Sequence, residues 1–147
     1  MTLESQRPVR VLLVEHEPED LGGLRNAVAE VRGGTVEIEW ASALAAALER
    51  LTQGGIDAVL LDLMLPDSEG MVAFERIRAF APDVPIVVMA SVDDEDLALA
   101  TVQGGAQDYL VKGGVYPKMM VKVMYYAIER QRVRSALLSL SLIDELT

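Results

Sequence analysis

The sequence predicts an α/β fold built on a parallel five-stranded sheet, because its apolar pattern switches repeatedly between two periods. Short, β-branched runs typical of buried strands alternate with stretches that carry apolar residues at helical spacing. The length of 147 residues fits one domain, and no internal repeat or domain boundary is visible before residue 117. Such alternation implies right-handed crossovers and helices on both faces of the sheet, a doubly wound arrangement.

The first strand and helix are followed by a strand of a different kind. Val9–Val14 is a short apolar run that stops at acidic residues, which predicts a strand buried on both faces. Residues 19–31 have apolar side chains at helical spacing, and Gly33-Gly34 ends that helix. Residues 35–40 alternate apolar and acidic side chains. We therefore expect a strand with one solvent-exposed face, near an edge of the sheet.

The middle of the chain contains the second helix and the third strand. Ser42 can cap a helix over residues 43–51, which Gly54-Gly55 closes. Residues 57–63, DAVLLDL, form an apolar run that predicts another strand buried on both faces. The polar residues 66–70 that follow predict a loop.

The remaining elements continue the alternation of helix and strand. A helix is expected over residues 71–80 and a third fully apolar strand over 86–90. An acidic start indicates a helix over 93–102, and the last strand follows at 108–111. From Pro117 a longer helix runs on with no residue that would break it.

The composition excludes several classes of protein. The chain has 13 basic and 23 acidic residues, a net charge of −10, which disfavours direct binding to nucleic acid or to an anionic membrane. It has no cysteine and one histidine, which excludes disulfides, thiol catalysis, iron–sulfur clusters and multi-histidine metal centres. No apolar run is long enough to span a bilayer and the N-terminus lacks a signal peptide, so we expect a cytoplasmic protein.

The residues that end the predicted strands are the candidates for a functional site, because ligands of open α/β sheets bind beyond the carboxyl ends of the strands. The first strand ends at Glu15-His16-Glu17, the third at Asp62, the fourth at Ala90-Ser91 and the fifth at Lys112. Two carboxylates and a lysine are therefore expected to meet at one edge of the sheet.

Asp62 is the most informative of these residues, because it interrupts an apolar run and an isolated buried carboxylate is costly. A carboxylate facing a lysine is an arrangement suited to a nucleophile. Phosphoryl transfer to a carboxylate needs in-line positioning and charge neutralisation, which an ammonium and an oxygen-bound hard cation supply. The alternatives are a loop or helix-capping carboxylate at Asp62 and a solvated strand-end lysine at Lys112.

Four stretches together resemble the receiver domains of two-component response regulators. They are VLLVEHEPED, DAVLLDLMLPDSEG, PDVPIVVMAS and GAQDYLVKGG, in the order and at the spacing of the family, over about residues 9–134. The resemblance implies a flavodoxin-like fold with strand order 2-1-3-4-5. It also implies that Asp62 is the phosphoacceptor, that a histidine kinase or phosphotransfer protein is the partner, and that Mg²⁺ is the cofactor.

The resemblance also implies roles for other residues. Lys112 would contact the phosphoryl group, and Tyr109 matches the aromatic position that changes rotamer on activation. Glu15 and Asp62, with the backbone carbonyl of Met64, would hold the metal ion.

The sequence departs from the family at two positions of this set. His16 stands where a magnesium-ligating aspartate is expected, and neutral imidazole is a poor ligand for a hard cation. Glu17, close by in sequence, is an alternative ligand. Ala90 replaces the usual Ser or Thr that contacts the phosphoryl group, and the adjacent Ser91 could compensate only if the strand has already ended there. Gly113, where many receivers have proline, is a smaller departure.

The C-terminal helix continues beyond what one sheet can cover. Val133, Leu137 and Leu140 recur at near-heptad steps, which indicates either a capping helix or a signalling helix that leads to an output domain and supports a homodimer. The ending SLIDELT resembles the segment that opens GGDEF-type diguanylate cyclase domains. We therefore divide the chain into an N-terminal extension (1–8), a receiver (9–130) and a linker (131–147).

Three alternatives to a phosphorylated receiver follow from the same residues. A degenerate receiver would act by protein contact and dimerisation without phosphate, and the departures at His16 and Ala90 favour it. An aspartate-nucleophile phosphatase would carry its acidic motif after the first strand rather than the third. A flavodoxin-type cofactor binder would need a Ser/Thr-rich phosphate loop where this chain has EHEPED. The receiver itself is expected to be a regulatory domain and not an enzyme.

Overall fold

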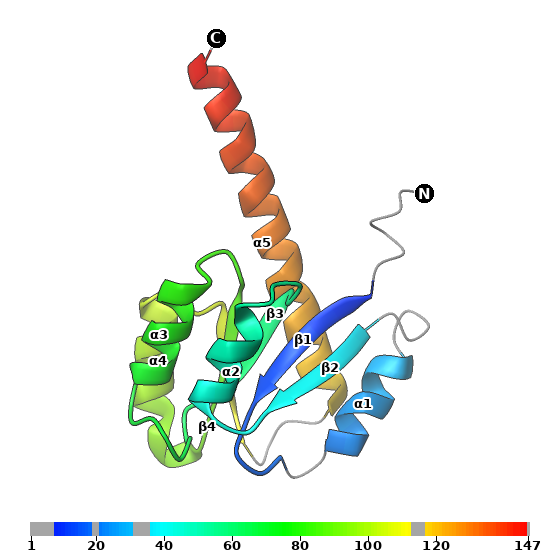
Figure 1. Ribbon diagram of the computed structural model, residues 1–147, viewed down its shortest axis with the longest axis vertical. Helices are drawn as coiled ribbons and strands as arrows, with labels where there is room; N and C mark the ends of the chain where they lie inside the picture. The colour runs from blue at the N-terminus through cyan, green and yellow to red at the C-terminus, as the bar shows by residue number, and fades with distance from the viewer. Residues whose placement is uncertain (1–7, 19–20, 31–35, 113–116, 147) are drawn as a thin grey trace.

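A five-stranded parallel sheet forms the centre of the molecule (Figure 1). The computed structural model describes residues 8–18, 21–30, 36–112 and 117–146. The strands lie in the order β2-β1-β3-β4-β5, and all neighbouring pairs are parallel. Their bounds are β1 Val9–Val14, β2 Val36–Ala41, β3 Ala58–Asp62, β4 Ile86–Ala90 and β5 Asp108–Val111. The predicted fold class, strand order and edge position of the second strand are confirmed.

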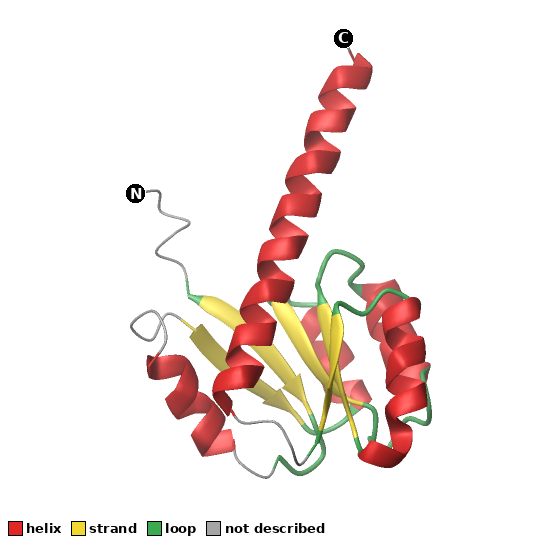
Figure 2. Ribbon diagram, turned by 180° about the vertical axis from the view of Figure 1, so that it is seen from behind, coloured by secondary structure: helices red, strands yellow, loops and turns green. Residues whose placement is uncertain are grey.

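Helices cover both faces of the sheet (Figure 2). One apolar cluster packs three helices against one face, and a second cluster packs two helices against the other. The first group is α2 Leu44–Leu51, α3 Val72–Phe80 and α4 Glu95–Gln103, and the second is α1 Leu21–Glu30 and α5 Pro117–Leu146. The central strands β3 and β4 are buried along their whole length, as expected for parallel strands covered on both sides.

The helix boundaries differ from the sequence prediction in detail. The region expected to form one helix over residues 93–102 begins with a short 3₁₀ turn, Val92–Asp94, and continues as α4. The ends expected for the first helix, at residues 19 and 31 with Gly33-Gly34, lie outside the described residues. Gly54 and Gly55 adopt positive φ after α2, the conformation that glycine allows at a helix end.

The prediction that Ser42 caps the second helix is wrong. Ala43 occupies the N-cap position of α2 and makes no side-chain cap. Instead, the Asp67 carboxylate accepts hydrogen bonds from the backbone N–H groups of Leu44 at 2.8 Å and Ala45 at 3.0 Å. The hydrogen bond from Ala45 lowers the pKa of Asp67 most, and the one from Leu44 lowers it further. The cap therefore comes from the loop after β3 and ties that loop to α2.

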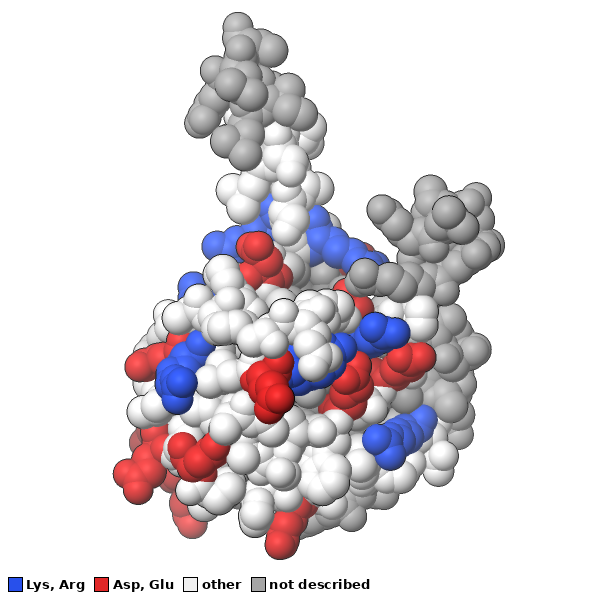
Figure 3. Space-filling view, viewed as in Figure 1, with Lys and Arg blue, Asp and Glu red and all other residues white. Residues whose placement is uncertain are grey.

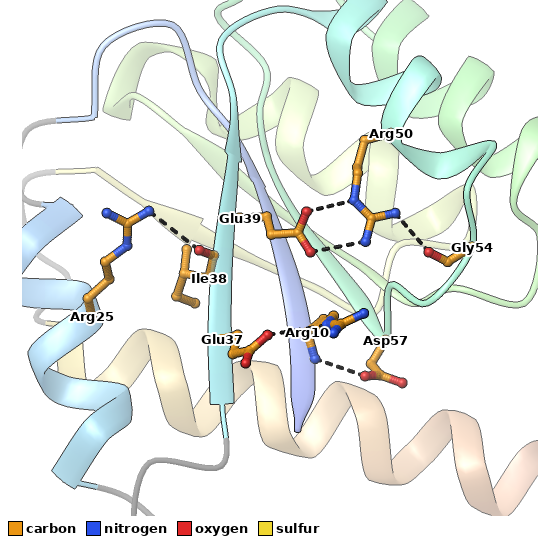
Figure 4. Close-up of polar contacts among 8 residues, drawn as sticks. All are labelled: Arg10, Arg25, Glu37, Ile38, Glu39, Arg50, Gly54 and Asp57. Atoms are coloured by element: carbon orange, nitrogen blue, oxygen red, sulfur yellow. Dashed lines mark hydrogen bonds and ion pairs between the residues drawn. The ribbon is translucent and has the colours of Figure 1, made fainter. Parts of the chain in front are cut away.

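Strand β2 forms one edge of the sheet, and its polar side chains are paired (Figure 4). Arg50 Nε lies 2.6 Å from Glu39 Oε1, and this hydrogen bond lowers the pKa of Glu39. Arg10 Nε lies 3.2 Å from Glu37 Oε2. Charged side chains along an exposed edge discourage further strand pairing. The polar face that the sequence predicted for this strand therefore has a role in protecting the sheet.

Helix α5 extends well beyond the sheet (Figures 1 and 2). Its inner side packs on the sheet through four residues: Val121, Met124, Ala127 and Ile128. After Ile128, no described side chain of the helix is buried, and four large apolar side chains are exposed: Val133, Leu137, Leu138 and Leu140. Across the described residues, no helix combines the length and apolar character needed to cross a membrane.

Candidate functional site

Asp62, Glu15 and Lys112 lie together at the carboxyl edge of the sheet. Asp62 is the last residue of β3, Glu15 follows β1 and Lys112 follows β5. Asp62 is only 2% exposed, and among the described residues it is the one ionisable residue in the buried core. Lys112 Nζ contacts Asp62 Oδ2 and lies 3.3 Å from Glu15 Oε1. The meeting of two carboxylates and a lysine, expected from the strand ends, is what the structure contains.

Lys112 is a charged group held between two acids. Burial by itself would lower the pKa of Lys112, but the hydrogen bond to Asp62 and the negative charges of Asp62 and Glu15 raise it above its usual value. The ammonium therefore stays protonated at neutral pH. Its side chain is one-third exposed, so it can reach a group that enters from solvent while remaining paired with Asp62.

The loop after β3 fixes the second oxygen of Asp62. Asp62 Oδ1 accepts a hydrogen bond of 2.9 Å from the backbone N–H of Met64. The same loop carries Asp67, whose cap on α2 anchors it at its far end. The orientation of the Asp62 carboxylate is thus set by Lys112 on one oxygen and by Met64 on the other.

His16 and Glu17 lie on the surface next to this cluster. Their side chains are 56% and 88% exposed, and His16 Nε2 lies 3.9 Å from Glu17 Oε1. His16 also lines a surface hollow with Met64 and Asp94. Glu17, the more exposed of the two, is a weak candidate for a ligand beside the buried Asp62.

The oxygen donors at the site fit a hard cation in kind. Glu15 and Asp62 provide two carboxylates, and Met64 provides a backbone carbonyl in the adjoining loop; such oxygens suit Mg²⁺. Within the part of the chain that the structure describes, however, no group of three His, Cys, Asp or Glu side chains is arranged to hold a metal ion. The donors therefore match Mg²⁺ in kind, while the described residues offer fewer than three acidic side chains together to bind it.

The residues at the end of β4 lie in two different environments. Ala90 is fully buried and belongs to the same apolar cluster as Leu61. Ser91 Oγ donates a hydrogen bond of 2.9 Å to Asp94 Oδ2, across the start of the 3₁₀ turn. Tyr109 on β5 is partly buried against the cluster that contains Ala90. The Ser91 hydroxyl is therefore engaged with Asp94, and Ala90 offers no hydroxyl.

Trp40 is a residue of this site that the sequence analysis did not single out. Its indole Nε1 donates a hydrogen bond of 2.7 Å to the carbonyl oxygen of Glu15, and the Glu15 N–H donates to the Ala41 carbonyl at 3.0 Å. The end of β2 thus holds the backbone of Glu15 on both sides. The sequence did contain a signal for it: the only tryptophan of the chain ends the predicted strand over residues 35–40, in which apolar and acidic residues alternate.

The comparison with known proteins gives one family. The response regulator receiver domain matches residues 11–123. The swarming motility regulation protein RssB of Serratia marcescens is 30% identical over 115 residues, which are 78% of this chain and 51% of RssB. The transcriptional regulatory protein PrrA of Mycobacterium tuberculosis is 32% identical over 127 residues, 86% of this chain and 52% of PrrA. The chain thus spans about half the length of these relatives.

The acidic sequence led us to expect that this chain has no nucleic-acid partner. PrrA is a transcriptional regulatory protein, so the comparison gives no support to the expected absence of a nucleic-acid partner. The acidic composition argues only about direct binding by this chain.

Solved structures agree on the fold. A response regulator receiver domain protein from Clostridium thermocellum superposes with a TM-score of 0.73 at 24% identity, over 85% of this chain and 98% of the other. The signal receiver domain of a LuxO repressor protein from Vibrio parahaemolyticus gives a TM-score of 0.76 at 22% identity, over 89% and 97%. The family matches residues 11–123, which are most of this chain, and the sheet has the strand order that the resemblance implied. This chain therefore belongs to the response regulator receiver domain family.

Proposed function

We propose that this chain is a signal receiver that accepts a phosphoryl group on Asp62 from a histidine kinase or a phosphotransfer protein. The observation that carries the proposal is the buried Asp62 carboxylate at the sheet edge, oriented by Met64 and contacted by Lys112. A buried, oriented carboxylate beside a fixed positive charge is suited to nucleophilic attack on phosphorus.

The chemistry follows from what each residue holds in place. A carboxylate oxygen of Asp62 forms a bond to phosphorus while the bond from phosphorus to the donor nitrogen or oxygen breaks, and the donor leaves with that electron pair. Lys112 neutralises charge on the phosphoryl oxygens, and its raised pKa keeps it charged for this role. Glu15, Asp62 and the Met64 carbonyl would hold Mg²⁺, which when bound supplies further charge neutralisation.

Incubation of the chain with acetyl phosphate and Mg²⁺ tests this proposal. Mass spectrometry of the intact protein should then detect one added phosphate, stable in acid and labile in base, as expected for an acyl phosphate. If an ordinary receiver is labelled under the same conditions and this chain is not, the proposal is wrong.

The wider function is regulation of an attached output domain. The relatives are about twice as long as the matched region, which is consistent with a receiver (9–130) followed by a linker (131–147) and an output unit. The cytoplasmic location expected from the sequence is part of the same proposal. The SLIDELT ending favours a diguanylate cyclase as that output. Under this proposal the chain is the regulatory part, and any enzymatic activity resides in the output domain.

A second candidate function has specific support. In a degenerate receiver, signalling would depend on protein contacts and dimerisation without phosphate. His16 is directed to Glu17 at the surface, Ala90 lacks a hydroxyl, and the Ser91 hydroxyl is bound to Asp94. The labelling experiment above separates the two functions, because only the first requires an adduct.

Replacement of His16 with Asp is expected to strengthen Mg²⁺ binding. The change adds an anionic oxygen next to Glu15, where an imidazole now stands, and hard cations prefer such oxygens. Calorimetric titration with Mg²⁺ should show a lower dissociation constant for His16→Asp than for the unmodified chain. Glu17→Asp is the control, since it keeps the charge at a position that is 88% exposed. Equal or weaker binding by His16→Asp would mean that another group already fills this ligand position.

Replacement of Trp40 with Phe is expected to weaken Mg²⁺ binding by about two- to tenfold, because one neutral hydrogen bond contributes about 0.5–1.5 kcal/mol. The phenyl ring keeps the aromatic surface but cannot donate to the Glu15 carbonyl. The same titration measures the effect. Phe80→Leu, which alters another half-exposed aromatic side chain, on α3, should leave affinity unchanged. Unchanged affinity in Trp40→Phe would show that Glu15 is positioned without the indole.

A further inference from the structure

Helix α5 carries a regularly spaced stripe of side chains, most of them exposed and apolar. The α5 stripe consists of seven residues: Met119, Val123, Tyr126, Arg130, Val133, Leu137 and Leu140. Successive members are separated by alternating steps of four and three residues, the spacing that keeps side chains on one seam of a left-handed coiled coil. Five of the seven are large apolar residues between 47 and 65% exposed.

The α5 stripe lies on a different side of the helix from the side that packs on the sheet. The sheet side is formed by Val121, Met124, Ala127 and Ile128, all buried. None of these four belongs to the seven-residue pattern. Over the body of the domain, Val123 is partly buried against the apolar cluster that joins α5 to the sheet. From Tyr126 onward every member of the stripe is exposed, so the free part of the stripe begins at the edge of the body and continues along the protruding part of the helix.

We propose that the α5 stripe binds the same stripe of a second copy of this chain, with the two helices parallel and in register. The regular three- and four-residue spacing matches a helix of the same period, which a second copy supplies. The dimer surface itself follows from the spacing and charges of the helix, and only its role in signalling to an output domain rests on the proposed function.

Charge complementarity favours the parallel, in-register arrangement. Glu129 comes directly before Arg130 of the stripe. Arg134 comes directly after Val133 of the stripe, five residues after Glu129. In a parallel pair these flanking positions face each other, so Glu129 of one copy meets Arg134 of the second copy. Both residues are exposed, and within one chain Glu129 pairs only at the surface, with Arg132 at 3.0 Å.

Arg130 gives the register a further constraint. It is the one charged residue within the stripe, and a polar residue at an inward position lowers stability while fixing register. In the parallel arrangement the Glu129 carboxylates of both copies lie close to the two Arg130 side chains. Figure 3 shows basic and acidic side chains together around α5 where it leaves the body, with uncharged side chains beyond them. The helix thus has a charged segment followed by an uncharged one, residues 135–141.

Sedimentation equilibrium of the full 147-residue chain tests the surface. Leu140→Ser should raise the dimer dissociation constant by at least about tenfold, because each dimer loses two buried leucine side chains. Leu138→Ser is the matched control: both leucines are 59% exposed on the same helix, but Leu138 lies off the stripe. A monomer at every accessible concentration, or equal effects of the two substitutions, would overturn the proposal.

A charge exchange tests orientation and register. Glu129→Arg and Arg134→Glu should each weaken the dimer, and the double variant should restore it. Arg132→Glu, which removes only the pair within the helix, should have no such effect. Failure of the double variant to restore the dimer would exclude the parallel, in-register pairing. Labelling of Asp62 by acetyl phosphate in the same variants is measured separately, so loss of dimerisation and failure of the phosphoacceptor proposal are distinguishable.

Discussion

Replacement of Asp62 with Asn is expected to abolish labelling of the chain by acetyl phosphate. The amide keeps the size of the carboxylate and an oxygen that can accept from the Met64 N–H, but it cannot attack phosphorus as a nucleophile. Intact-mass spectrometry should therefore show one phosphate on the unmodified chain and none on Asp62→Asn. Glu69→Gln is the matched control, because Glu69 is an exposed carboxylate in the same loop and its replacement should leave labelling intact.

The Asp62→Asn variant is expected to remain folded, which keeps this experiment interpretable. Removing one partner of a fully buried ion pair costs about 3–5 kcal/mol. Here Lys112 retains Glu15 at 3.3 Å and is one-third exposed, so the free energy of unfolding should fall by less than that. Circular dichroism and thermal unfolding check the fold. A folded Asp62→Asn chain that still takes up one acid-stable, base-labile phosphate would place the acceptor at another residue.

Much of the site could be predicted because it depends on strand ends. In a parallel sheet the apolar runs themselves mark where strands stop, and the carboxyl ends of all strands lie at one edge. Glu15, Asp62 and Lys112 each follow or end such a run, so their meeting required no knowledge of side-chain conformations. The long final helix was predictable for a similar reason, since no glycine or proline interrupts it after Pro117.

The features that the sequence did not reveal depend on contacts between distant segments. Ser42 had the right chemistry for a cap, but Asp67, more than twenty residues later, caps α2 instead. The hydrogen bond from Trp40 to Glu15 joins two strands whose relative register cannot be read from either alone. Ser91 and Asp94 are close in sequence, so their hydrogen bond is local. A Ser91 hydroxyl that is bound to Asp94 does not contact a phosphoryl group at the same time, and residue spacing alone does not show which of the two it binds.

Replacement of Ala90 with Thr is expected to increase the response of the chain to phosphorylation. Ala90 has no hydroxyl, so a phosphoryl group on Asp62 lacks one hydrogen bond that would couple it to the loop after β4 and to Tyr109, which packs against the same apolar cluster. A hydrogen bond to a charged group contributes about 1.5–3 kcal/mol, comparable to the free-energy gap between two states of a switch. Light scattering, with and without a phosphate analogue and Mg²⁺, should show a larger change in oligomeric state for Ala90→Thr.

The control for this prediction is Ala90→Val, which has nearly the shape of threonine but no hydroxyl. Ala90 is fully buried, so both substitutions add volume to a packed site at a cost of about 1–3 kcal/mol, and only the threonine adds a donor. A larger response in Ala90→Thr than in Ala90→Val therefore reports the hydroxyl and not the strain. Ser91→Ala should change the response little, because the Ser91 hydroxyl is already bound to Asp94. If the unmodified chain responds fully and Ser91→Ala removes the response, Ser91 leaves Asp94 on phosphorylation and takes the role assigned here to residue 90.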